Sequence, residues 1–341
     1  MKILVLSVGD PARTASTLYR VAQYEDLWKL HGVDVTYIPK QDINDGILEH
    51  VRDVDVVLNQ KCLIDPRMGA RIRKAAKRLI FDFDDAIWTR PGKDFSYFSR
   101  WRIARRLRWW LGASDAVISA NSVLSSWAKP HARQVHEIGM AIDLHRWQPS
   151  SVAPEKDVIL AGWIGSPAYI GLLESVEPFL AEAQRQEPRL RFAVYSGVRP
   201  AWKMEFQYTP YAPGTDVQFV QSLDIGLLPM HDDAFARGKS PIKALQYHAC
   251  RVPVVGNIHG AAVDLVDTTN GVPAHNPQQW IAALVRLTRD RQFRMELAAN
   301  GLQRVQEQHD IRNQASRVLA VLTGSDGPQP QAVNTSSIRS A

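Results

Sequence analysis

The stretch that most constrains the fold covers residues 224–257 and reads DIGLLPMHDDAFARGKSPIKALQYHACRVPVVGN. Two short apolar runs, 224–230 and 252–255, enclose a loop and a helical segment. Short apolar runs with β-branched residues are typical of strands that are buried on both faces of a parallel sheet. Ile242, Leu245 and Ala249 fall at positions i, i+3 and i+7, which would place them on the core side of the helix. The pattern predicts a strand–loop–helix–strand unit of an open α/β sheet.

The start of this predicted helix carries unusual positive charge. Ser240 suits the N-cap and Pro241 the first helical position, and Lys239 and Lys243 lie on either side of them. The positive end of the helix dipole disfavours cations, so two lysines there are unfavourable unless an anion binds beside them. Gly238, free N–H groups and lysine together suit a phosphate. The alternative is that both lysines are solvated and merely flank the helix.

The same stretch resembles the donor-site signature of retaining GT-B glycosyltransferases of the family 4 type. The resemblance is to a subgroup written roughly D-I-G-(apolar)-x-P…R-G-K-x-x-x-K-x-L-x-Y-x-A-x-x-x-P-V-V, and it extends more loosely over nearly the whole chain. In that family the segment holds a nucleotide-diphosphate sugar, which implies that Lys239, Ser240 and Lys243 contact the diphosphate. The family usually carries two glutamates eight positions apart, and Gly238 and Gln246 stand in their places here.

The domain organisation follows from length, composition and this resemblance. A length of 341 residues suggests two domains, and 45% hydrophobic with 22% charged residues is a globular balance. Strands and helices alternate on both sides of a polar, proline- and serine-containing segment, QPSSVAPEKD. The prediction is an α/β protein of the GT-B fold, with two Rossmann-like parallel-sheet domains facing each other across a cleft. Its expected parts are an acceptor-side domain (1–147), a linker (148–157), a nucleotide-sugar-binding domain (158–310), a helix returning to the first domain (311–323) and a disordered tail (324–341).

The compartment expected from the sequence is the cytoplasm. No apolar run approaches the roughly 18 residues of a membrane-spanning helix. The first apolar run ends at Gly9, Asp10 and Pro11, so it predicts a strand rather than a signal peptide. Cys62 and Cys250 are the only cysteines, which excludes a disulfide framework and argues against a structural zinc site.

Several glycines directly follow predicted strands, where ligands meet open α/β sheets. Gly9 follows the first strand. Arg13 and Arg20 flank this loop and the helix after it and could reach an anion, but we expect them at the surface, where arginine usually lies. The run GWIGSP resembles the first loop of the GT-B nucleotide domain, which implies that Gly165 and Ser166 present N–H groups to the diphosphate. The expected donor-binding residues are Gly9, Gly165, Ser166, Gly197, Gly238, Lys239, Ser240, Lys243 and Gln246.

Three aspartates cluster in the run LIFDFDDAIW, residues 79–88. Side chains alternate along a strand, so Asp82 and Asp84 would point to the same face. Carboxylates placed so close together repel one another, and such a cluster tends to carry a metal, a shared proton or a hydroxylated ligand. The structural alternative is that the carboxylates pair with the many nearby arginines.

This run is similar to three known motifs. FDFDD resembles the first motif of haloacid-dehalogenase-type phosphatases, which would make the protein a metal-dependent phosphatase using Asp82 and Asp84. It also resembles the DxD metal motif of GT-A transferases. The GT-B subgroup above often carries D-x-D-D-A-x-W facing its acceptor cleft. We favour this third interpretation, because Asp85 and Ala86 stand where the phosphatase motif has glycine or a hydroxyl residue. The expected acceptor-side residues are Gln60, Lys61, Asp84, Asp85 and Trp88.

A strongly basic helix is predicted over residues 100–111, RWRIARRLRWWL. Ile103, Leu107, Trp110 and Leu111 group on one side of it, with arginines over the other. Arginine beside interfacial tryptophan suits a helix lying on an anionic bilayer. The alternatives are a nucleic-acid surface and a core helix whose arginines cover the protein surface. The residues expected to contact a membrane are Trp101, Arg102, Arg105, Arg106 and Trp109.

The resemblance implies an enzyme, a retaining glycosyltransferase of the hexosyl type. Its acceptor would be a glycan or lipid-linked glycan of polysaccharide or cell-envelope biosynthesis, at the inner face of the cytoplasmic membrane, and no nucleic acid is expected as a partner. The catalytic candidates are Lys239, Lys243, Asp84 and Asp85. Because lysines and a helix dipole would supply the positive charge, no metal or cofactor is expected beyond the nucleotide-diphosphate sugar. A non-catalytic nucleotide-sugar-binding protein is the alternative.

Overall fold

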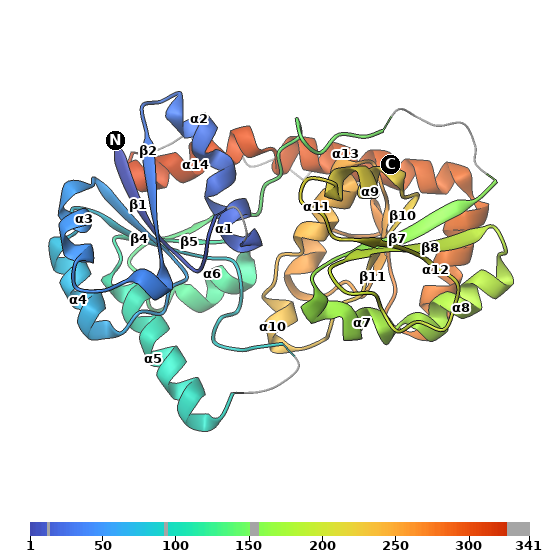
Figure 1. Ribbon diagram of the computed structural model, residues 1–341, viewed down its shortest axis with the longest axis horizontal. Coiled ribbons are helices and arrows are strands. Elements are labelled where there is room, and N and C mark those ends of the chain that lie inside the picture. Colours follow the sequence, from blue (N-terminus) through green and yellow to red (C-terminus); the bar gives the residue numbers. More distant parts are fainter. Residues whose placement is uncertain (12–13, 92–94, 151–156, 326–341) are drawn as a thin grey trace, which may run out of the picture.

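The computed structural model describes residues 1–11, 14–91, 95–150 and 157–325, and shows two α/β domains side by side (Figure 1). Each domain is built on one six-stranded sheet. Every strand pair within both sheets is parallel. The prediction of two parallel-sheet domains is therefore confirmed.

The first sheet has the strand order β2-β1-β3-β4-β5-β6. Its central strands are apolar runs buried on both faces, as β3 and β4 are along their whole length. Its strands are β1 (Lys2–Ser7), β2 (Asp34–Pro39), β3 (Val56–Gln60), β4 (Leu79–Phe83), β5 (Ala116–Ser119) and β6 (Val135–Glu137). Its helices are α1 (Ala15–Arg20), η1 (Ala22–Tyr24), α2 (Glu25–Lys29), η2 (Lys40–Asp42), α3 (Ile47–Asp53), α4 (Pro66–Ala75), α5 (Tyr97–Ala113) and α6 (Ser122–Ala128).

The second sheet has the order β12-β11-β10-β7-β8-β9. Its strands are β7 (Ile159–Ile164), β8 (Leu190–Ser196), β9 (Gln207–Pro210), β10 (Ile225–Leu228), β11 (Val254–Gly256) and β12 (Gly271–Pro273). The helices of this half are η3 (Pro167–Tyr169), α7 (Ile170–Glu174), α8 (Glu177–Gln186), α9 (Asp216–Ser222), α10 (Ala234–Arg237), α11 (Ile242–Ala249), η4 (Gly260–Asp264), α12 (Pro277–Arg289), α13 (Arg291–Gln308) and α14 (Ile311–Thr323).

The last helix leaves the second domain and packs on the first (Figure 1). The crossing point is held by backbone hydrogen bonds from Ile142 N to His309 O, at 2.9 Å, and from Ile311 N to Ile142 O, at 3.2 Å. Beyond it, Ile311 and Ala315 join the core around β1, and the Trp28 indole N–H donates to Ala315 O at 2.9 Å. α14 thereby ties the two ends of the chain together.

Two further features concern membrane-spanning helices and the end of the described chain. Among the helices that the structure describes, none combines the length and apolar character needed to cross a bilayer. Of the tail expected to be disordered, only Gly324 and Ser325 are described. Gly324 ends α14 in the left-handed region, with a φ of 72°, as glycine after a helix commonly does.

Candidate active site

The candidate site is built around the start of α11. β10 ends at Leu228, and a loop containing the short α10 leads into α11, which begins at Ile242 with Pro241 in the N-cap position. The prediction that Ser240 caps this helix was wrong. The Ser240 hydroxyl instead accepts a hydrogen bond from Asn121 Nδ2 at 2.9 Å, so a residue of the first domain takes the group that a cap would have used.

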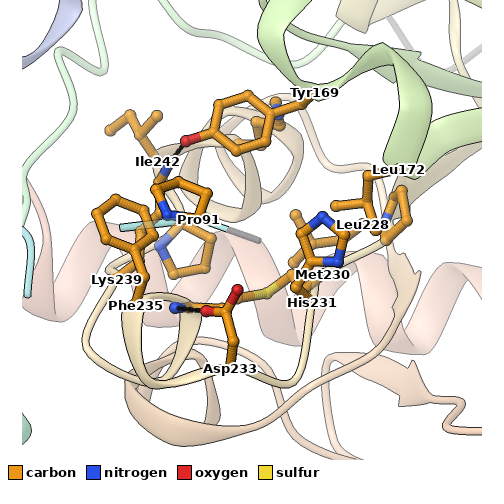
Figure 2. A pocket seen from close by; sticks show the side chains of 14 residues that line it. Pro91, Tyr169, Leu172, Leu228, Met230, His231, Asp233, Phe235, Lys239 and Ile242 are labelled. Carbon is orange, nitrogen blue, oxygen red and sulfur yellow. Dashed lines mark hydrogen bonds between the residues drawn. The ribbon is translucent and has the colours of Figure 1, made fainter. Parts of the chain in front are cut away.

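Lys239 and Lys243 lie together on a group of aromatic rings. Lys239 Nζ donates to the Tyr169 hydroxyl at 2.7 Å and lies 4.3 Å from the centre of that ring (Figure 2). Lys243 Nζ lies 4.6 Å from the centre of the Trp163 ring and 5.2 Å from that of Tyr169. Ring faces attract cations, and a cation that is removed from water gains most from this attraction.

Neither ammonium group forms an ion pair with any residue in the described ranges. Burial of the Lys243 ammonium between the rings, and then repulsion from Lys239, lower the pKa of Lys243 to about 7. The ring faces act in the opposite direction, because they favour the charged form. The two lysines therefore form a site where positive charge is concentrated and uncompensated, which is the condition that an anionic ligand relieves.

A pocket of about 100 Å³ lies against these lysines. Its volume is below the few hundred Å³ that complete small-molecule sites usually have, so it suits one part of a ligand. Figure 2 shows Asp233 and Phe235, from the loop after β10, on one side, with Tyr169 on another. The wall consists of Pro91, Tyr169, Leu172, Leu228, Pro229, Met230, His231, Asp233, Phe235, Ala236, Lys239, Pro241, Ile242 and Lys243.

The other residues expected to bind a donor lie outside this pocket wall. Gly165 does not offer a free N–H, because it donates to Tyr195 O at 3.0 Å, so that part of the prediction was wrong. A side chain at Gly165 would collide with the Trp163 ring, so the glycine allows the tryptophan to pack below Lys243. Ser166 caps η3 through its hydroxyl, which accepts from Ala168 N at 3.3 Å. Gly9 and Gly197 occupy loops directly after β1 and β8, and their role stays a prediction.

Gln246 joins the two domains rather than facing the pocket. Its side chain is buried on α11, and its Nε2 donates to the Tyr19 hydroxyl of α1 at 2.9 Å. Burial raises the pKa of Tyr19 to about 12, although Arg146 opposes the shift, so this hydroxyl stays protonated. In this arrangement the side-chain amide of Gln246 is engaged by a residue of the same chain, Tyr19.

Gly238 also sits at the contact between the domains. A Cβ added there would lie 2.7 Å from Ala86 Cβ, closer than two such atoms can approach. Asn121 Nδ2 donates to Gly238 O at 3.1 Å as well as to Ser240. Gly238 thus allows the loop before α11 to touch the first domain, and the position cannot hold a glutamate in this arrangement.

The aspartate cluster is paired with buried cations. The carboxylate oxygens of Asp82 accept from Arg20 Nε at 3.2 and 3.1 Å. Burial alone would lower the pKa of Arg20, but the negative charge of Asp82 outweighs burial and raises it. Arg20 is only 3% exposed, so its expected surface position was wrong. Arg13 lies outside the described residues. Ion pairing, the structural alternative for this cluster, accounts for Asp82.

Asp84 and Asp85 share Lys61. The Lys61 ammonium lies 2.7 Å from Asp84 Oδ1 and 2.5 Å from Asp85 Oδ2. Burial alone would raise the pKa of Asp84, but the Lys61 charge outweighs burial and lowers it, so Asp84 is ionised. Asp84 also accepts from Ser16 Oγ at 3.0 Å. In the described chain, no three His, Cys, Asp or Glu residues are grouped to hold a metal. Asp82 and Asp84, the carboxylates that the phosphatase interpretation needs, are both paired with cations of this chain, so that interpretation is not favoured.

The remaining acceptor-side candidates belong to the same region. Gln60 donates from Nε2 to Ser16 Oγ at 2.8 Å and accepts from Thr17 Oγ1 at 2.9 Å. Trp88 stacks on Trp127, with ring centres 4.4 Å apart. Sequence reasoning missed Ser16, Asn121 and Tyr19, because the partners that give them a role come from distant parts of the chain.

The basic helix α5 differs from its expected orientation at Trp109. Trp109 is half-buried and packs edge-on against Trp110, with ring centres 5.1 Å apart, so it does not face outward. Arg106 pairs with Asp65 at 3.1 Å. Trp101, Arg102 and Arg105 are exposed, as expected for surface contact.

The second half of the sequence matches a known family description. Residues 175–320, which include both lysines of the site, match a family model described as glycosyl transferase-like. Among proteins with curated functions, none matches the sequence closely enough to count as a relative.

The structure has clear neighbours among solved structures. It is similar to sucrose-phosphate synthase from Thermosynechococcus elongatus, with a TM-score of 0.73 and 14% identity over 95% of this chain and 98% of that chain. The fold is GT-B. HepE from Anabaena, in complex with UDP and glucose, has a TM-score of 0.69 and 15% identity over 95% of this chain and 100% of that one. An alpha-glucosyltransferase in complex with UDP and DNA has a TM-score of 0.63 and 12% identity, over 95% and 99% of the two chains.

These similarities confirm the predicted fold class. At such low identity the solved structures establish the GT-B architecture alone. The match to a glycosyl transferase-like family model is a separate finding, made on the sequence. The residues that match the family model, 175–320, include the lysine pair.

Proposed function

We propose that this protein is a retaining glycosyltransferase, which moves a sugar from a nucleotide-diphosphate sugar to a hydroxyl acceptor. The observation that carries the proposal is the pair of ammonium groups of Lys239 and Lys243, without anionic partners among the described residues. They lie at the start of α11, inside the segment that matches a glycosyl transferase-like family. The GT-B fold supports the same assignment.

Each lysine has a role that follows from its position. Lys239 is held by the Tyr169 hydroxyl, and Lys243 by the rings of Trp163 and Tyr169, so both charges are oriented before a donor arrives. Charge fixed in advance at a partly desolvated site stabilises a developing anion more than mobile charge does. The two lysines and the positive end of α11 would neutralise the departing nucleoside diphosphate, and no divalent ion is proposed.

The proposed reaction exchanges one bond for another at the anomeric carbon. The bond from this carbon to the diphosphate oxygen breaks, and its electron pair stays on the diphosphate. The acceptor oxygen forms the new bond on the same face of the sugar, and its proton passes to the departing diphosphate. Asp84, ionised beside Lys61, would orient the acceptor by accepting a hydrogen bond, with Asp85, Gln60 and Trp88 nearby.

The proposed donor is a UDP-sugar, and the proposed acceptor is a glycan or lipid-linked glycan. HepE, one of the structural neighbours, was solved with UDP-glucose, which makes this donor the first to test. We further propose that the protein works in cell-surface polysaccharide assembly, at the cytoplasmic face of a membrane.

The test is a thermal-shift panel of UDP-, GDP-, ADP- and dTDP-sugars, with and without magnesium. A bound donor raises the melting temperature by mass action, so the panel identifies the base. Lys239→Ala should abolish the shift and lower kcat/KM for donor turnover by about 10²–10³. Lys203→Ala, which removes an exposed lysine elsewhere in the second domain, is the control. Unchanged turnover in Lys239→Ala would refute the assignment of the site.

A non-catalytic nucleotide-sugar-binding protein is the second candidate. It is favoured by Gly238 and Gln246, which pack in the domain contact where the resembled family has glutamates. A donor that shifts the melting temperature but is neither hydrolysed nor transferred, with any acceptor tried, would support this second candidate.

A further inference from the structure

The first two turns of α5 expose a cluster of large aromatic side chains. Phe98 is 81% exposed, Tyr97 is 79% exposed and Trp101 is 58% exposed. Tyr97 and Phe98 lie edge to face, with ring centres 5.9 Å apart. This end of α5 projects away from both sheets (Figure 1). Single exposed apolar residues are ordinary, but a contiguous group of them marks a surface that contacts something else.

A hollow of about 410 Å³ lies beside this cluster, between the start of α4 and α5. It is lined by Asp65, Pro66, Arg67, Trp101, Arg102, Arg105 and Arg106. Its single carboxylate, that of Asp65, is already engaged, since it pairs with Arg106 and caps α4 through the N–H of Arg67.

The other guanidinium groups of the hollow are not ion-paired within the described residues, although the charge of Arg67 also acts on Asp65. Arg67, Arg102 and Arg105 form no ion pair within the described part of the chain. Arg105 lies over the Trp101 ring, 5.5 Å from its centre, so one aromatic residue of the exposed cluster also forms a wall of the cationic hollow. Guanidinium groups bind phosphate well, because their planar N–H pairs match its oxygens.

We propose that this surface docks on an anionic lipid bilayer. Tyr97, Phe98 and Trp101 would lie at the boundary between headgroups and acyl chains, and the hollow would receive the phosphate of an anionic headgroup. Charge complementarity favours an anionic bilayer as the occupant, because arginines without ion-paired carboxylates border the aromatic cluster directly, and arginine beside exposed tryptophan is the composition of a helix that lies on anionic lipid. The proposal does not depend on the transfer reaction, since bilayer binding is measured without donor.

The experiment is flotation of the whole protein with vesicles of phosphatidylcholine, with and without phosphatidylglycerol. Binding should require phosphatidylglycerol. Arg102→Ala/Arg105→Ala should weaken it roughly thirtyfold, from about one kcal/mol for each arginine near the surface. Phe98→Ala/Trp101→Ala should also weaken it at least tenfold, at unchanged charge.

Two control variants separate this site from general surface effects. Arg108→Ala/Arg291→Ala removes the same charge from exposed positions outside the hollow, and Leu30→Ala removes an 82% exposed apolar side chain just after α2. Both control variants should bind vesicles like the wild type. All variants should keep the melting temperature of the wild type, because the altered side chains are exposed.

Three outcomes would overturn the proposal. The first is equal binding to neutral and anionic vesicles, and the second is equal loss of binding in the arginine variant and its charge-matched control. The third is a concentration-dependent dimer that Phe98→Ala/Trp101→Ala dissociates, without vesicle binding, which would assign the surface to a second copy of the chain.

Discussion

The pKa of Lys243 predicts how donor binding depends on pH. If the diphosphate binds to the charged form, the apparent affinity follows the fraction of Lys243 that is protonated in the free protein. With a pKa of about 7, this fraction is about nine-tenths at pH 6 and about one-tenth at pH 8. A donor that binds only to protonated Lys243 should therefore bind about tenfold more weakly at pH 8 than at pH 6, a difference in binding free energy of about 1.4 kcal/mol.

Isothermal titration with UDP-glucose measures this change. Both phosphates of the ligand are esterified, so the ligand itself keeps its charge across this range, which free UDP does not. Lys243→Arg keeps a positive charge at both pH values, so its affinity should be flat. His231, a second basic side chain, also lines the pocket. His231→Gln is therefore measured beside the wild type, and it should keep the tenfold change.

A flat profile in the wild type would refute the reasoning. It would mean that Lys243 remains charged throughout, or that the diphosphate does not contact it. If Lys243→Arg kept the pH dependence, a group other than Lys243 would be its cause. Lys239, the nearest cation, lowers the pKa of Lys243 in addition to burial. Lys239→Met should therefore raise the pKa of Lys243 itself, which NMR of the Lys243 side chain measures without a donor.

Three further predictions concern stability and domain contact. Because folding lowers the pKa of Lys243, the buried charge of this residue destabilises the folded state most below pH 7, and less as the pH rises towards 10.5. Lys243→Met should therefore be more stable than the wild type by about 2–3 kcal/mol at pH 6, allowing for partial exposure, with a smaller gain at pH 9, as measured by urea unfolding. Asp82→Asn leaves the buried Arg20 unpaired and should cost about 3–5 kcal/mol of unfolding free energy. Asp55→Asn, in the exposed pair with Lys77, should cost much less, and equal losses would refute the argument. Gly238→Ala should force the domains apart, seen as a larger radius of gyration in X-ray scattering and weaker donor binding, and Ala86→Gly should restore both.

The fold could be predicted because its signals are local. Buried parallel strands are largely apolar, as β1 is from Ile3 to Leu6, and this pattern repeats through both halves. The lysine pair could also be predicted, because two cations at a helix start are a local electrostatic conflict that sequence alone displays.

What could not be predicted depends on contacts between distant segments. The rings that hold the lysines come from β7, η3 and α10, and no local pattern brings Trp163, Tyr169 and Phe235 together. Arg20 was expected at the surface because arginine usually lies there, and only its pairing with Asp82, 62 positions away, makes burial tolerable. Ser240 does not cap α11 as predicted, and its hydroxyl accepts a hydrogen bond from Asn121, 119 positions earlier in the chain.

The two positions that lack the expected glutamates share one physical explanation. Gly238 touches Ala86, and Gln246 donates to Tyr19, so both positions lie where the domains meet. A glutamate at either position would bring a carboxylate into this contact, and burying an unpaired charge is costly. Glycine and glutamine keep the contact neutral and close. Lys239 directly follows Gly238, and Asn121 of the first domain donates to Gly238 O and to the Ser240 hydroxyl, so both domains hold the loop that carries this lysine.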